Sequence, residues 1–99
     1  MVLTVILSLL AGIIGGNAFP HFVKGITREN YPNVFGGTPI SNLIAGWAGF
    51  VVSFVVICFA KFNTFPIISA ASVALGVLLI GIFHAGPGAF GRVPVKKDM

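Results

Sequence analysis

The sequence contains few charged residues. Only 8% of its 99 residues are Asp, Glu, Lys or Arg, whereas a soluble domain usually has about 25%. Hydrophobic residues make up 57% of the chain, and the mean hydropathy is +1.04. A domain of this size has too much surface for its volume to hide so many apolar side chains from water. The composition excludes a water-soluble globular domain and predicts a membrane protein.

The sequence also has little of what enzymes and metal sites require. Its single cysteine, Cys58, cannot form an intrachain disulfide and has no second thiol beside it for a metal, so we expect a small buried hydrophobic residue there. The two carboxylates, Glu29 and Asp98, lie outside the apolar segments, and a zinc site needs about three or four ligands. No serine–histidine–acid set or phosphate-binding glycine motif occurs. We predict no catalytic residues, no metal and no cofactor.

The charged residues divide the chain into three uncharged blocks, which are residues 1–23, 30–60 and 62–91. A helix needs about 20 apolar residues to cross a bilayer. We therefore predict an all-α fold, a polytopic membrane protein that forms one domain as a three-transmembrane-helix bundle. The predicted helices cover about residues 2–23, 40–60 and 65–84, and a tail covers residues 85–99.

The connections between these predicted helices differ. The second and third are joined by a link of about four residues, so we expect them to form an antiparallel hairpin. The first contains Pro20, which lacks a backbone N–H, shortly after Gly15 and Gly16. These three residues predict a hinge, with a straight helix to Ala18 followed by a turn or a short interfacial helix over residues 19–26.

The basic residues predict the orientation in the membrane. One side carries five of them: Lys24, Arg28, Arg92, Lys96 and Lys97. The other side carries Lys61 alone. The positive-inside rule places the first loop and the C-terminal tail in the cytoplasm and the N-terminus outside. The same rule accounts for the net charge of +4 without any nucleic-acid partner.

Small residues recur at four-residue spacing in all three predicted helices. They are Ser8, Gly12 and Gly16 in the first, Ala45, Gly49 and Ser53 in the second, and Ser72 and Gly76 in the third. In lipid, small residues let helix backbones approach closely and so supply packing energy. Two interpretations are open: the residues pack the three helices of one chain, or they pack copies of the chain together.

Four polar residues form a candidate site near the predicted cytoplasmic interface. Asn17, His21 and Lys24 have the spacing i, i+4 and i+7, which places them on one face of the first helix. His84 ends the third helix on the same side, and the two histidines could relay a proton or meet at a ligand. The simpler alternative is that each histidine bonds to lipid headgroups or to carbonyls at a helix end.

Two segments carry a resemblance. Residues 20–27, PHFVKGIT, followed by Pro32 and Phe35, and residues 43–50, LIAGWAGF, resemble segments of uncharacterised small bacterial integral membrane proteins. The resemblance implies a bacterial inner-membrane location and implies nothing about activity. It directs attention to the first loop, because loops often carry function on a plain scaffold.

Two functional hypotheses follow from these features. The first is a non-catalytic membrane protein that packs with itself or with a partner membrane protein, based on the small residues and the lack of a reactive set. The alternative is an oligomeric channel or carrier for a small solute or ion, based on Asn17, His21 and the predicted hinge. The absence of a charge inside any span argues against coupled ion transport.

Overall fold

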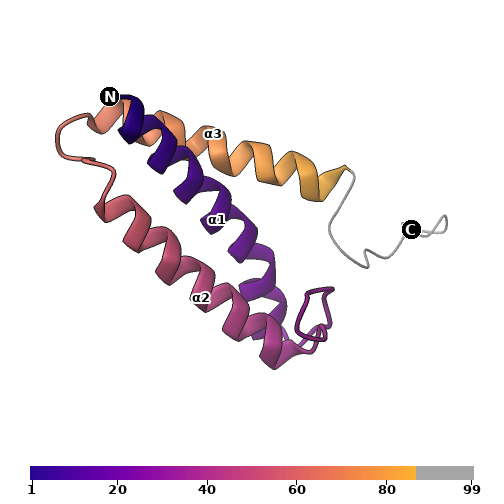
Figure 1. Cartoon of the computed structure of the whole chain (residues 1–99). Coiled ribbons are helices and arrows are strands. Elements are labelled where there is room, and N and C mark those ends of the chain that lie inside the picture. The colour runs from indigo at the N-terminus through magenta and orange to yellow at the C-terminus, as the bar shows by residue number, and fades with distance from the viewer. Residues whose placement is uncertain (87–99) are drawn as a thin grey trace.

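Three helices make up the part of the fold that the structure describes. The computed structural model describes residues 1–86, with α1 at Val2–Ile26, α2 at Pro39–Cys58 and α3 at Pro66–Ala85 (Figure 1). Each helix is long and apolar enough to cross a membrane, and no strand occurs in the described part of the chain. The all-α three-helix prediction is confirmed, and the protein is a multi-pass membrane protein. The expected tail beyond residue 86 lies outside the described residues.

The central helix of the bundle is α1. Figure 1 shows α1 between α2 and α3, and both of these helices pack on α1 but not on each other. The expected packing of α2 against α3 as a hairpin is therefore wrong. The short link over residues 59–65 reverses the chain direction, but the small residues of both helices face α1, so the close contacts form there instead.

Glycines bring the α1 and α2 backbones close together. A β-carbon added at Gly46 would lie 2.5 Å from the backbone nitrogen of Phe22, and one at Gly25 would lie 2.6 Å from the backbone nitrogen of Leu43. Toward the other end, the Ser53 hydroxyl donates a 2.7 Å hydrogen bond to the carbonyl oxygen of Ala11. These contacts follow α1 in one direction and α2 in the other, so the two helices are antiparallel.

Pro20 does not end α1. The helix continues to Ile26, so the expected turn or separate short helix over residues 19–26 is wrong. A proline removes only one helical hydrogen bond, and the helical segment after it packs on α2 through Phe22 and Gly25. After Ile26, the amides of Arg28 and Glu29 bond back to the carbonyls of Gly25 and Lys24, which is the Schellman arrangement of a helix end.

The outside of the bundle is apolar, and its inside contains small and polar side chains. Large apolar residues such as Trp47, Phe54 and Ile67 are exposed, whereas the largest fully buried side chains are Asn42, Thr4, Ser8 and Ser69. This distribution suits a protein whose solvent is lipid. Cys58, the last residue of α2, is exposed, contrary to the expectation that it is buried.

Candidate functional site

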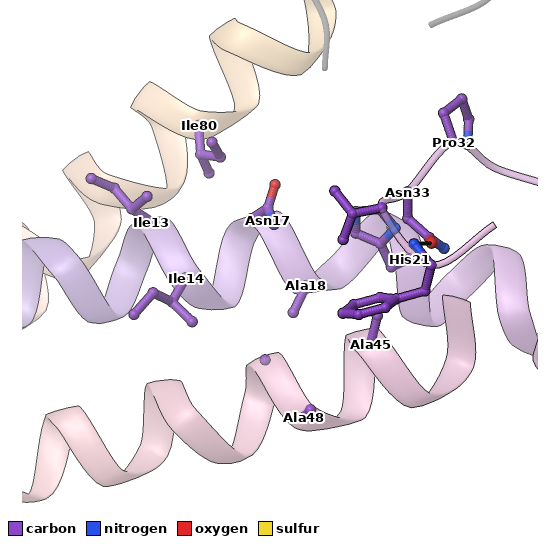
Figure 2. Close-up of a pocket in the computed structure, with 13 residues that line it drawn as sticks. Ile13, Ile14, Asn17, Ala18, His21, Pro32, Asn33, Ala45, Ala48 and Ile80 are labelled. Atoms are coloured by element: carbon purple, nitrogen blue, oxygen red, sulfur yellow. Dashed lines mark hydrogen bonds between the residues drawn. The ribbon is translucent and has the colours of Figure 1, made fainter. Parts of the chain in front are cut away.

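A cavity of about 440 Å³ lies in the half of the bundle where α1 meets the loop over residues 27–38 (Figure 2). It is lined by Ile13, Ile14, Asn17, Ala18 and His21 of α1, by Pro32, Asn33, Val34 and Phe35 of the loop, by Ala45, Ala48 and Gly49 of α2, and by Ile80 of α3. Small-molecule sites typically have volumes of about 300–1,000 Å³ and an apolar lining with a few polar groups. This cavity has both properties.

His21 is the most buried of the polar residues in the cavity lining, with 9% of its surface exposed. Its Nδ1 lies 2.7 Å from the Oδ1 of Asn42 in α2, and its ring meets that of Tyr31 edge-on at a centroid distance of 5.1 Å. Because Oδ1 can only accept, Nδ1 carries the hydrogen. The second ring nitrogen, Nε2, makes no hydrogen bond within residues 1–86.

Asn42 is the residue that joins the loop to the bundle, and its side chain is fully buried. Besides His21, its Oδ1 accepts a 2.7 Å hydrogen bond from the Nδ2 of Asn33. Its own Nδ2 donates to the carbonyl oxygens of Tyr31, Gly37 and Thr38 at 2.8, 3.2 and 3.1 Å. The sequence analysis missed Asn42. The available signal was an amide side chain in the first turn of an otherwise apolar helix, where every buried polar group needs a partner.

Asn33 shapes the loop rather than offering groups to a ligand. Its Oδ1 accepts hydrogen bonds from the backbone nitrogens of Phe35 and Gly37 at 2.6 and 3.4 Å, and its Nδ2 donates to Asn42 and, at 3.3 Å, to the Ser41 hydroxyl. Gly37 has a φ of +81°, a conformation that glycine adopts without steric cost. The side chain of Asn33 is therefore satisfied inside the protein.

The three polar residues predicted on one face of α1 do not all lie at the cavity. Asn17 and His21 both line the cavity, and Figure 2 shows them on the same side of α1. Asn17 is exposed, and its amide makes no hydrogen bond within the described part of the chain. Lys24 does not line the cavity, and its Nζ pairs with the Glu29 carboxylate at 3.0 Å. The hydrogen bond from Lys24 is the main cause that holds the pKa of Glu29 below its ordinary value.

His84 belongs to a different environment. Its Nδ1 donates to the carbonyl oxygen of Ile80, one turn earlier in α3, at 2.8 Å, and its ring meets that of Phe83 edge-on. Its Nε2 is buried without a partner among residues 1–86. No hydrogen bond joins the two histidines in that range, and no group of three or more His, Cys, Asp or Glu side chains gathers there. His84 thus makes the helix-end carbonyl bond that was the simpler alternative.

Several of the small residues expected at helix contacts lie between helices of this chain. A β-carbon on Gly12 or Gly76 would collide with the facing backbone at Val73 or Leu9, respectively. One on Gly49 would lie 2.6 Å from the β-carbon of Ala18. Ser8 and Ser72 are buried, Ser53 bonds to α1, and Ala45 lines the cavity. The structure places this set inside one bundle.

The three residues of the predicted hinge lie in the half of α1 that carries the cavity. A β-carbon on Gly15 would lie 3.0 Å from the Ser53 hydroxyl, and one on Gly16 would lie 2.6 Å from the side chain of Ile80. Pro20 lies inside the helix, directly before His21. Close packing against α2 and α3 therefore accounts for both glycines.

Comparisons with known proteins give no match: no family model, no curated protein and no solved structure is significantly similar to this chain.

Proposed function

We propose that this protein is a non-catalytic membrane protein that binds a small amphiphilic molecule from the bilayer in the cavity between α1, α2 and the loop. One observation carries the proposal: a mostly apolar cavity of about 440 Å³ contains two hydrogen-bonding groups, on Asn17 and His21, that have no partner within residues 1–86. Polar groups in an apolar setting are costly unless they are paired. A ligand with an apolar body and a polar end would fill the cavity and pair these groups.

The packing of the small residues favours this proposal over association with another protein. The expectation of a second copy or a partner membrane protein rested on these residues. Gly12, Gly49 and Gly76 are already in close contact inside the chain, so they are not available to another helix. The cavity, by contrast, is a space that the packing of the three helices does not fill.

Binding in the cavity can be tested by a substitution whose larger side chain fills the cavity. Ala48 lines the cavity and is exposed, so Ala48→Phe adds volume there without displacing a buried group. Ala71→Phe is the matched control, because Ala71 is exposed on α3 and does not line the cavity. The protein is reconstituted in nanodiscs with a long-chain alcohol that carries a photoreactive diazirine, and labelled positions are mapped by mass spectrometry.

We expect wild type and Ala71→Phe to be labelled mainly at cavity residues such as Val34 and Phe35, and Ala48→Phe to lose most of that labelling. Labelling spread evenly over the lipid-facing residues, and equal in the three proteins, would refute binding in the cavity.

A carrier for a small solute or ion is a second candidate. It is supported by the position of Pro20, which interrupts the hydrogen bonding of α1 next to the cavity residue His21. The measurement is flux of protons and common ions into liposomes that contain the protein. Identical background leak for wild type and His21→Ala would exclude this candidate.

We also propose that the loop end of the bundle faces the cytoplasm of a bacterial inner membrane. Lys24 and Arg28 lie where α1 meets the loop, whereas Lys61 lies in the link at the opposite end. Reporter fusions at Lys61 and after Met99 test the orientation. A cytoplasmic signal from the Lys61 fusion would contradict it.

A further inference from the structure

Two side chains in the cavity have hydrogen-bonding capacity that the protein does not use. His21 is 9% exposed, and its ring is held by the bond from Nδ1 to Asn42. With the hydrogen on Nδ1, the Nε2 of the neutral ring is an acceptor that requires a donor. Unlike the Nε2 of His84, this atom is not fully buried, so a ligand in the cavity can reach it. Asn17, one helical turn away, offers an amide with both donor and acceptor atoms and no partner in residues 1–86.

The groups available in this pair specify the chemistry of a ligand. A carboxylic acid can donate its O–H to the Nε2 of His21 and accept, at its carbonyl oxygen, a hydrogen bond from the Nδ2 of Asn17. If the proton passes to the ring, the carboxylate accepts from both groups instead. An alcohol must donate to His21 and accept from Asn17 with a single oxygen, whereas the acid offers a separate oxygen to each residue, and an ester lacks the donor. A carboxylic acid is thus the polar head group that can form one hydrogen bond to each of the two residues through its own oxygen.

The rest of the cavity fits an alkyl chain. One to two turns deeper in α1 lie Ile13 and Ile14, and Ile80 of α3 lines the same space. His21 is nearer the loop end than Asn17, so the polar head would lie toward the membrane surface and the chain toward the bilayer centre. No charged side chain lines the cavity among the described residues, and Lys24 is paired with Glu29. The head is therefore recognised by hydrogen bonds, not by a fixed cation.

We propose that the ligand is a long-chain fatty acid, held by its carboxyl group between His21 and Asn17. This inference rests on the proposed function, because it requires the cavity to be the binding site.

The experiment compares three photoreactive probes of equal chain length: a fatty acid, its methyl ester and the corresponding alcohol. Each carries a diazirine in the chain and is incorporated into nanodiscs with the protein. We expect the acid to label the cavity at about one fifth of the concentration that the ester requires, since one hydrogen bond contributes about 1 kcal/mol and 1.4 kcal/mol corresponds to a factor of about ten.

Two variants remove the recognising atoms while keeping the fold. Asn17→Ala deletes an amide that makes no hydrogen bond within residues 1–86. His21→Asn retains an N–H near the position of Nδ1, for the bond to Asn42, and removes Nε2. We expect each variant to weaken labelling by the acid about fivefold. His21→Asn, unlike Asn17→Ala, should leave labelling by the ester nearly unchanged, because the ester has no O–H to donate to Nε2 but keeps a carbonyl oxygen that accepts from Asn17.

The outcomes separate the inference from the function on which it rests. Equal labelling by all three probes that is abolished by Ala48→Phe would retain the cavity as a binding site and overturn the fatty-acid inference. A preference for the acid that survives both Asn17→Ala and His21→Asn would also overturn it. If Ala48→Phe changes the labelling by none of the probes, the proposed function itself fails.

Discussion

His21 of α1 and Asn42 of α2, 21 positions apart in the sequence, are joined by a 2.7 Å hydrogen bond between Nδ1 and Oδ1. The bond connects a residue of the cavity lining, His21, to the residue that holds the loop, Asn42. The same amide of Asn42 holds the loop through Tyr31, Asn33 and Gly37, and the same ring lines the cavity. The position of the loop over the cavity and the tautomer of the histidine are consequently set by one buried side chain, that of Asn42.

Replacing Asn42 should weaken both the loop and the bundle. Asn42→Ala leaves the Nδ1 of His21, the Nδ2 of Asn33 and the carbonyl of Tyr31 without their present partner. Because unpaired buried polar groups cost about 1–3 kcal/mol each and the loop can partly relax toward water, we expect a loss of about 2–4 kcal/mol in the free energy of unfolding. The measurement is unfolding by SDS in mixed micelles, followed by the fluorescence of Trp47, the single tryptophan.

Asn63→Ala is the control for this variant, because Asn63 is exposed in the link between α2 and α3. It should change the unfolding free energy by less than about 0.5 kcal/mol. Trypsin cleavage after Arg28 should also become faster in Asn42→Ala and stay unchanged in Asn63→Ala. Equal stability of the two variants would show that Asn42 does not hold the loop.

The close contact of α1 and α2 predicts opposite effects for the same substitution at two glycines. Gly46→Ala would place a β-carbon 2.5 Å from the backbone nitrogen of Phe22, so the helices must separate, and we expect a loss of about 1–3 kcal/mol. Gly81→Ala meets nothing within 4 Å, and alanine is favoured over glycine in a helix by up to about 1 kcal/mol. The same SDS titration applies. A stabilising Gly46→Ala would contradict the packing described here.

The number and type of the helices could be predicted from the sequence, because uncharged blocks longer than about 20 residues have few alternatives in a bilayer. The arrangement of the helices could not. Small-residue spacing marks the faces that pack but does not say which helix each face meets, so the pairing of α2 and α3 with α1 was missed. The predicted break at Pro20 is wrong, because the contacts of Phe22 and Gly25 with α2 compensate for the loss of one helical hydrogen bond.

The candidate site was predictable only in part. Asn17 and His21 were found through their helical spacing and do line one cavity. Asn42 and Asn33 were not, since their importance depends on how a loop of about twelve residues folds back on the helix, and local patterns do not determine such long-range pairing. Lys24 had the right spacing, but its long side chain reaches Glu29 instead.

The ion pair at the end of α1 predicts a pH dependence. The hydrogen bond from Lys24 holds the pKa of Glu29 below its ordinary value. A lowered carboxyl pKa stabilises the fold above the ordinary pKa, and this contribution is lost as the pH falls through the folded-state pKa. Lys24→Met should therefore raise the pKa of Glu29 toward its ordinary value, as followed by NMR of the carboxyl carbon during a titration. Arg28→Gln, the control, should leave it nearly unchanged. An unaltered pKa in Lys24→Met would exclude the pair in the membrane-bound protein.

The residue after the end of α1 offers a test of the backbone itself. Arg28 has a φ of +62° in the Schellman arrangement, a position that glycine usually fills. A residue with a β-carbon is disfavoured there by about 1–2 kcal/mol. Arg28→Gly and Arg28→Ala remove the same charge, but only glycine removes the strain. We expect Arg28→Gly to be more stable than Arg28→Ala by about 1 kcal/mol in SDS unfolding, partly offset by the greater freedom of glycine in the unfolded chain. Equal stability would mean that α1 ends with a different backbone conformation, and that the loop leaves the helix in another direction.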